Sequence, residues 1–197
     1  MDIREIKIKT TPYNRTGYIL PFIHPNIEIS QGYNGQYSHK AFEYIGTCAR
    51  TLHDDRFSIE FALPVNTPIR AAKEGKVKSF LSGCTNYYQG LDIQEASKYY
   101  TNHIFLLHED GSFTLYSHLQ KNSLLVQRDQ YVKQGQLLAK TGLSGWIGPI
   151  PHLHFSAGTF VGENILSRHT FPIQFNDYNG PLEQEEIDLE TMCFSYG

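Results

Sequence analysis

The alternation of apolar and polar residues along the chain predicts a series of short β-strands. In FSIEFAL, residues 57–63, every second side chain is large and apolar, so these side chains share one face and Glu60 points to the other. The runs IFLLH and SFTLYSHL are rich in β-branched and aromatic residues and flank Asp110-Gly111, a pattern typical of a β-hairpin. The clearest local signals therefore favour sheet.

Two further strands are predicted at 132–140 and 152–158, whereas helix signals are weak everywhere. Residues 40–55 show no clean period and are predicted to be an inserted loop, and the polar, tyrosine-rich segment 83–101 is predicted to be a second one. We therefore expect a mostly β fold in which two antiparallel sheets form an open sandwich. Long loops, including 143–151, would surround a groove over one sheet.

Length and composition describe one folded domain. A chain of 197 residues with 40% hydrophobic and 19% charged residues is too short for two full-sized domains and too apolar to be disordered. We expect an N-terminal extension, 1–30, to pack on the main domain, 31–175, and an acidic C-terminal tail to occupy 176–197. The formal net charge of −3 provides no basic field that would attract nucleic acid or an acidic membrane surface.

The chain shows no sign of a membrane span or of a dense disulfide framework. No apolar stretch reaches the ~18 residues that a span requires, and the charged opening MDIREIKIKT lacks the apolar centre of a signal peptide. The three cysteines, Cys48, Cys84 and Cys193, are widely spaced without a C-x-x-C pair, which does not fit a zinc ribbon. One disulfide and one spare thiol are compatible with this spacing.

Histidines supply the candidate chemistry. In PHLHF, residues 151–155, His152 and His154 lie two apart in an apolar strand and therefore project from the same face. Such a pair either holds one metal ion together or divides the work between metal binding and the reacting group, although alone it is equally typical of a polar sheet face. The same period in FTLYSHL places Tyr116 and His118 on one face, so we expect a phenol and a third imidazole to reach the same cleft.

Four blocks of the sequence carry a resemblance when they are taken together and in order. They are EFALPVNTPIRAAKEGKV (60–77), LLHEDGSFTLYSHL (106–119), YVKQGQLLAKTGLSG (131–145) and PHLHF (151–155). In this order they resemble the lysostaphin-type, LytM-like zinc endopeptidases of bacterial cell walls. The resemblance implies a LytM-like open sandwich, related to the barrel-sandwich hybrids, with a groove over one sheet.

The resemblance also implies roles for four residues. His154 matches the zinc-binding second histidine of the family's H-x-H, and His152 matches its catalytic first histidine. His118 matches the other catalytic histidine, in the Tyr-x-His-Leu block. Glu60 falls where the family usually carries a zinc-binding Asp, and its carboxylate can ligate zinc at ~2.0–2.2 Å if the backbone accommodates the extra methylene.

The third protein ligand departs from the commonest family pattern. That pattern places it four residues before the acid, where this chain has Arg56, and a guanidinium has no lone pair to give. One branch of the family instead carries its histidine in a phrase similar to QG-x-x-G-x-x-SH, which QGYNGQYSH, ending at His39, matches. We expect His39 to be the third ligand, with His53 or the lack of any third protein ligand as the alternatives.

The resemblance therefore implies a zinc metalloendopeptidase, a peptidoglycan hydrolase that cleaves stem or cross-bridge peptides outside the cytoplasm. With three protein ligands and an open fourth position, zinc would lower the pKa of a bound water toward ~7, and His118 and His152 would move the protons. Arg56 and Glu60, at the usual ligand positions, motivate an alternative, an inactive LytM-like module that binds peptidoglycan or regulates a partner hydrolase. The metal content of the protein would separate the two.

Overall fold

The computed structural model describes residues 2–5, 15–35, 39, 41–45, 50–90, 95, 98–161 and 164–182 of the chain. Its named elements are strands, which confirms the prediction of a mostly β protein. Their bounds are β1 (Asp2–Glu5), β2 (Ile29–Gln31), β3 (Ala41–Ile45), β4 (Arg50–Asp54), β5 (Ile59–Ala62), β6 (Pro68–Arg70), β7 (Gly75–Leu81), β8 (Tyr87–Tyr88), β9 (His103–Leu107), β10 (Ser112–Ser117), β11 (Tyr131–Val132), β12 (Leu137–Lys140), β13 (Gly145–Trp146), β14 (His152–Val161) and β15 (Asn164–Thr170).

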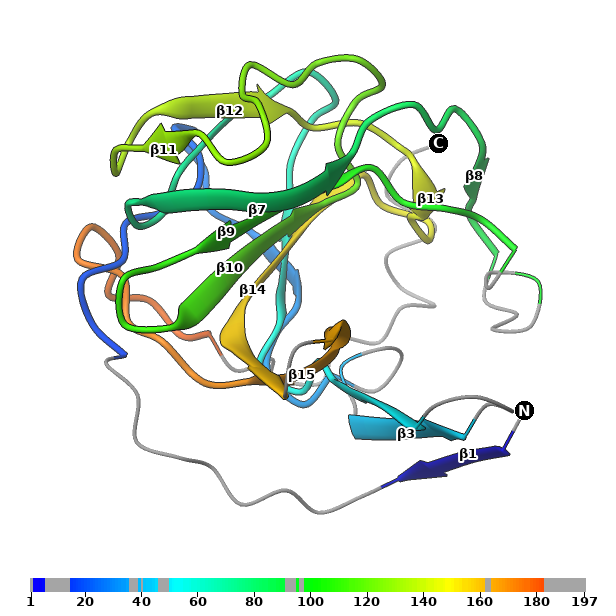
Figure 1. Cartoon of the computed structure of the whole chain (residues 1–197). Coiled ribbons are helices and arrows are strands. Elements are labelled where there is room, and N and C mark those ends of the chain that lie inside the picture. Colours follow the sequence, from blue (N-terminus) through cyan, green and yellow to red (C-terminus); the bar gives the residue numbers. More distant parts are fainter. Residues whose placement is uncertain are drawn as a thin grey trace.

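One large sheet organises the fold (Figure 1). Nine of its strands follow the order β1-β3-β4-β15-β14-β10-β9-β7-β11, and β5 and β2 lie off this path, with β2 paired to β5. The long strand β14 pairs with β10 along one edge, and along its other edge it pairs first with β5 and then with β15. Two small sheets, β6–β12 and β8–β13, complete the architecture. The predicted antiparallel pairing holds for most neighbours, and β4–β15 and β8–β13 add two parallel pairs.

Alternate positions of the central strands fill the core. Phe61 in β5, Tyr116 in β10 and Phe155 in β14 are each 0% exposed, and the rings of Tyr116 and Phe155 meet edge to face at 5.3 Å. Phe22, from the segment that precedes β2, packs on Phe61 with ring centroids 5.0 Å apart. Because side chains alternate across a strand, the opposite faces of β5 and β14 carry polar residues, and the candidate site is built there.

The segment 40–55, predicted as an inserted loop, contains the strands β3 and β4 instead. β3 pairs antiparallel with β4, and β4 pairs parallel with β15, so the large sheet continues past β15. The loop prediction is therefore wrong for this segment. Strands near a sheet edge are held by backbone hydrogen bonds, which do not require the clean apolar alternation that sequence reasoning looks for.

The hairpin β9–β10 forms as predicted, but the residues at its end do not keep the strand alternation. Tyr116 lies in the core, where its hydroxyl accepts a hydrogen bond from Ala72 N at 2.8 Å. His118 follows β10 with a φ of 62°, a left-handed conformation, and it lines the pocket described below. The expectation that Tyr116 and His118 share a cleft is wrong, because a period of two holds only while the backbone is extended.

The segments on either side of the main domain pack against it where the structure describes them. Tyr18 and Phe22, from the predicted N-terminal extension, belong to the core. Near the other end, Asp177 Oδ2 accepts a hydrogen bond from Arg70 Nη2 at 2.8 Å. Most of the predicted acidic tail, residues 183–197, lies outside the described residues. The three-part division of the chain therefore stays a prediction.

The structure describes one of the three cysteines. Cys84 is a free thiol of intermediate exposure, while Cys48 and Cys193 lie outside the described residues. Within the described part of the chain, no helix is long and apolar enough to cross a membrane.

Candidate metal and catalytic site

A pocket of about 410 Å³ lies over the polar faces of β5 and β14. The segment 146–150 contributes an apolar wall, and Trp146 both lines the pocket and anchors this wall by donating its Nε1–H to Gly90 O at 2.8 Å. The strands β9, β10 and β15 contribute further side chains. The complete lining is Ser30, Gln31, His53, Asp55, Glu60, Thr101, His103, Phe105, Leu115, Ser117, His118, Trp146, Ile147, Gly148, Pro149, Ile150, His152, His154 and Arg168.

The register of the sheet brings Glu60 and His154 together. Glu60 in β5 stands directly opposite His154 in β14, and Glu60 Oε1 lies 3.8 Å from His154 Nδ1. His39, which precedes β3, places its Nε2 3.4 Å from the same oxygen, and its ring meets that of His154 edge to face at 5.4 Å. One ligand atom from each of the three residues lies within 4.8 Å of the other two.

The spacing and chemistry of these side chains fit a zinc ion. Ligand atoms ~2.1 Å from a tetrahedral zinc lie ~3.4 Å apart, close to the distances from Glu60 Oε1 to the two imidazoles. His39 Nδ1 donates to Gly32 O at 2.8 Å, and this bond selects the tautomer with a lone pair on Nε2. That buried Nε2 has no hydrogen-bond partner among the described residues. Two imidazoles and one carboxylate form a ligand set that zinc accepts.

The electrostatics of the three residues favour a cation between them. Burial alone would raise the pKa of Glu60, but the nearby His152, His154 and His39 hold it well below its usual value. Burial alone would lower the pKa of His39, yet the Glu60 carboxylate and the bond to Gly32 O raise it. Glu60 therefore stays ionised and favours positive charge at His39 Nε2, whether that charge is a proton or a metal ion.

His118 and His152 form a second pair of imidazoles beside these three residues. Their ring centroids lie 4.7 Å apart, and the ring of His118 lies 6.1 Å from that of His154. Each donates Nδ1–H to a backbone carbonyl at 2.8 Å, His118 to Ser144 O and His152 to Ile150 O. Both Nε2 atoms therefore carry lone pairs. Burial lowers the pKa of both rings, which keeps them neutral near pH 7.

A buried hydrogen-bond network holds the backbone directly after His118. Ser144 Oγ donates to Leu119 O at 3.0 Å and accepts from Asn102 N at 2.9 Å. Asn102 Nδ2 donates to Leu119 O at 3.1 Å and to Cys84 O at 2.9 Å. These bonds stabilise the left-handed conformation of His118. Sequence reasoning missed Asn102 and Ser144, because their role depends on contacts between segments that are distant along the chain.

His53, the alternative third ligand, lines the same pocket but is not part of the cluster formed by His39, Glu60 and His154. Its Nε2 lies 2.5 Å from Nη1 of Arg168, the residue directly opposite it in the β4–β15 pair. Burial and the charge of Arg168 lower the pKa of His53 to about 4. His53 Nδ1 also lies 3.7 Å from Asp55 Oδ2, so the structure places His53 beside the Arg168–Asp55 pair and His39 beside Glu60.

Two further pocket residues, Asp55 and Arg168, were not predicted from the sequence. Arg168 donates from Nε to Asp55 Oδ1 at 3.1 Å and from Nη2 to Asp55 Oδ2 at 2.9 Å. Burial alone would raise the pKa of Asp55, but Arg168 and His53 lower it to about 2. No sequence signal could have found this pair while 40–55 was taken as a loop, since the pairing of β4 with β15 brings the residues together.

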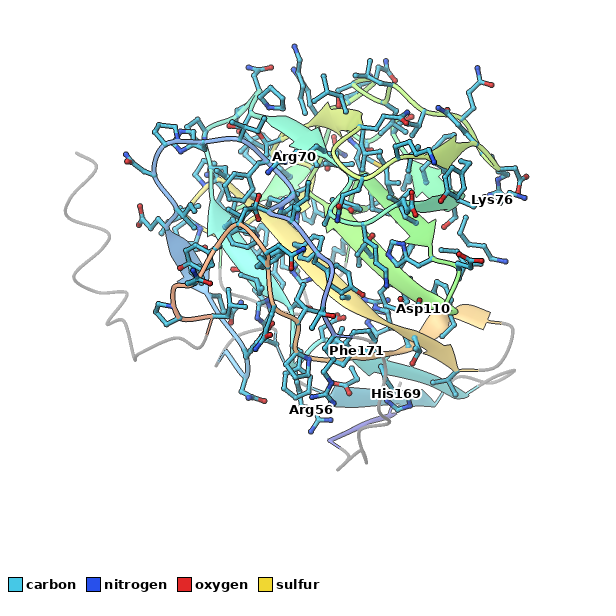
Figure 2. All side chains as sticks on the ribbon, turned by 90° about the vertical axis from the view of Figure 1, so that its left-hand side faces the viewer. Arg56, Arg70, Lys76, Asp110, His169 and Phe171 are labelled. Atoms are coloured by element: carbon cyan, nitrogen blue, oxygen red, sulfur yellow. The ribbon has the colours of Figure 1, made fainter. Side chains whose placement is uncertain are left out.

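Arg56, at the usual ligand position, lies outside the pocket lining. Its Nε donates to Oδ1 of the buried Asp54 at 2.9 Å and its Nη2 donates to Oδ2 at 3.1 Å. Figure 2 shows Arg56 near His169 at one end of the molecule, with Arg70 toward the other. Because Asp54 compensates the charge of Arg56, this arginine places no uncompensated positive charge at the candidate metal site.

Comparisons with known proteins give the family of the chain. A model described as peptidase family M23 matches residues 55–164, more than half of the chain. The glycyl-glycine endopeptidase ALE-1 of Staphylococcus capitis is 31% identical over 119 residues, which is 60% of this chain. The peptidoglycan DD-endopeptidase ShyB of Vibrio cholerae is 31% identical over 96 residues, or 49% of this chain. The matched parts make up only 28% of ALE-1 and 18% of ShyB.

A similar solved structure is the catalytic domain of lysostaphin from Staphylococcus simulans. It is 25% identical with a TM-score of 0.42, and the match covers 66% of this chain and 79% of that one. The family match and the relatives confirm the resemblance to the lysostaphin-type, LytM-like peptidases that the four sequence blocks indicate. The chain belongs to peptidase family M23.

Proposed function

We propose that the protein is a zinc-dependent endopeptidase that hydrolyses amide bonds in peptidoglycan stem or cross-bridge peptides. The observation that carries this proposal is the convergence of His39, Glu60 and His154, whose ligand atoms lie within 4.8 Å of one another. The names of the two relatives, a glycyl-glycine endopeptidase and a peptidoglycan DD-endopeptidase, support the substrate class. Because peptidoglycan lies outside the cytoplasm, the activity would be periplasmic or secreted.

In this proposal the pocket residues hold the ion and move protons around it. A zinc ion held by His39, Glu60 and His154 would supply a Lewis acid that polarises the scissile carbonyl and lowers the pKa of water. His152 Nε2 lies 3.7 Å from Glu60 Oε1, at the border of the ligand cluster. The rings of His152 and His118, with their centroids 4.7 Å apart, both carry unprotonated Nε2 atoms, so this pair would take the proton from the attacking water and return one to the leaving amine.

The test combines metal analysis with digestion of cell-wall peptides. Purified protein should contain close to one zinc per chain, release muropeptide fragments from cell-wall digests, and lose that activity on treatment with a chelator. His39→Ala should lower zinc affinity by at least tenfold and abolish hydrolysis, because it removes a ligand. The matched control is His53→Ala, which removes another pocket imidazole that lies outside the cluster and should keep the zinc.

Two outcomes would contradict the proposal. Zinc binding that survives His39→Ala but is lost in His53→Ala would show that the ligand set is wrong. A zinc-loaded protein that leaves every muropeptide intact yet binds peptidoglycan would favour the alternative function, an inactive module that binds the cell wall or regulates a partner hydrolase.

A further inference from the structure

The ion pair of Arg168 and Asp55 lies in the catalytic pocket but has no part in holding zinc or moving protons. It is contributed by β15 and by the residue that follows β4, and His53 joins it from β4. Arg168 and His53 both lie outside residues 55–164, which the family model matches. The side chain of Arg168 is 8% exposed and that of Asp55 is 17% exposed, so the pair is largely desolvated.

Arg168 has hydrogen-bonding capacity to spare. A guanidinium carries five N–H groups, and in Arg168 three of them face Asp55 Oδ1, Asp55 Oδ2 and His53 Nε2. One N–H on Nη1 and one on Nη2 are left without an acceptor among the described residues. The guanidinium is also held by the Phe105 ring, whose centroid lies 5.9 Å from Cζ. Arg168 lines the pocket, so the two remaining donors belong to a fixed, planar group in the pocket wall.

A role in stability alone does not account for this arrangement. Burying an ion pair costs desolvation energy that is often not recovered, so such a pair is weak evidence for stability. Because Arg168 lines the pocket, its two remaining N–H groups are available to water or to a ligand there. A ligand that accepts both hydrogen bonds would offset the desolvation cost, and the planar fork of an arginine matches the two oxygens of a carboxylate.

With a divalent ion at the ligand cluster, the charge of the pocket would favour an anion. Apart from histidines, the ionisable side chains that line it are Asp55, Glu60 and Arg168. Their formal charges add to −1, and a divalent ion at the ligand cluster would change the total to +1. A carboxylate on the substrate would neutralise that charge, whereas a neutral carbonyl would not.

We propose that the free end of Arg168 binds a carboxylate of the substrate peptide, so that the pocket selects stem peptides with a free carboxylate over the same peptides with a carboxamide at that position. His53 and Asp55 would then be positioning residues that fix the guanidinium. This inference rests on the proposed function, and it narrows the substrate class to acidic, non-amidated peptides.

The experiment measures binding rather than turnover. A synthetic stem tripeptide is prepared with all carboxylates free and with each one converted to a carboxamide in turn, and affinities for the zinc-loaded protein are measured by calorimetry. One of these conversions should weaken binding to the wild type about tenfold or more. In Arg168→Gln the same conversion should change the affinity less than twofold. Zinc contributes equally to both proteins. The ratio of acid to amide affinity in the wild type, divided by the same ratio in Arg168→Gln, therefore isolates the contribution of Arg168.

Arg56→Gln is the matched control, because Arg56 makes the same two-point contact with Asp54 but does not line the pocket. This variant should keep the full preference for the peptide with the free carboxylate over its carboxamide. If Arg168→Gln fails to fold, the double variant Asp55→Asn/Arg168→Gln removes both charges together. Arg168→Lys, which keeps the charge without the fork, should bind the acid more weakly than the wild type.

The inference is overturned if none of the amidated peptides binds the wild type more weakly than the peptide with free carboxylates. It is also overturned if Arg168→Gln weakens the binding of the acid and the amide forms equally, as expected of an arginine that binds a neutral carbonyl. These failures are distinguishable from failure of the proposed function. Hydrolysis of muropeptides without a preference for the acid would leave the endopeptidase proposal intact, and an Arg168-dependent preference without hydrolysis would leave only the binding site.

Discussion

Replacing Ser144 by alanine should loosen the segment that carries His118, by an amount that follows from the hydrogen bonds. Ser144 is 4% exposed, and its hydroxyl makes buried bonds with Asn102 N and Leu119 O. In Ser144→Ala, Leu119 O keeps the bond from Asn102 Nδ2, but the Asn102 N–H is left buried without an acceptor. Such a group costs about 1–3 kcal/mol, so the free energy of unfolding should fall by about 2 kcal/mol.

Urea denaturation followed by circular dichroism measures this change, and Ser123→Ala is the matched control. The hydroxyl of Ser123 donates to Gln120 O at 2.9 Å and accepts from Lys140 N at 3.1 Å, but this site is partly exposed. Water can replace these bonds, so the control should lose only about 0.5 kcal/mol. If Ser144→Ala is as stable as Ser123→Ala, the network does not hold the segment as described.

The same substitution has a second readout in the proposed peptidase activity. The backbone carbonyl of Ser144 survives as the acceptor for His118 Nδ1, so the tautomer of His118 should be unchanged. Its position should become less defined, and kcat should fall about tenfold with little change in KM or in zinc content. Ser144→Thr, which retains the hydroxyl, should restore most of the activity. Loss of zinc in Ser144→Ala would instead indicate a general loosening of the fold.

Two further predictions concern the fold and its pH dependence. Gly145 has a φ of 81° and an added Cβ would lie 2.0 Å from Thr101 Oγ1, so Gly145→Ala should lower the free energy of unfolding by about 3 kcal/mol. The control is Gly111→Ala: Gly111 has a φ of 82°, but no atom lies within 4 Å of an added Cβ, so the free energy of unfolding should fall by only about 1 kcal/mol. Equal losses in the two variants would contradict the clash at Gly145. Burial lowers the pKa of His108 from 6.5 to about 4, so the unfolded chain binds the proton more tightly and stability should fall by up to about 3 kcal/mol as the pH drops from 6.5 to 4. In His108→Asn, whose amide can still donate to Glu74 O, denaturant titrations across this pH range should show a flatter dependence, and an unchanged slope would refute the assignment.

The fold class was accessible from the sequence because it depends on local patterns. The alternation in 57–63 placed Glu60 opposite the apolar face, and β5 has Ile59 and Phe61 in the core and Glu60 in the pocket. The hairpin around Asp110-Gly111 and the common face of His152 and His154 follow from the same rule, and both are present in the structure. A period of two is a property of extended backbone, so a few neighbouring residues suffice to predict it.

Tertiary structure decided which distant residues meet. The phrase QGYNGQYSH favoured His39 over His53 only through its resemblance to one branch of the family, whereas the fold places His39 Nε2 3.4 Å from the Glu60 carboxylate and His53 Nε2 2.5 Å from Arg168. The left-handed turn at His118, which moves it away from the face of Tyr116, depends on hydrogen bonds from other segments. Strand pairing and buried hydrogen bonds join positions far apart along the chain, and short-range periodicity carries no information about them.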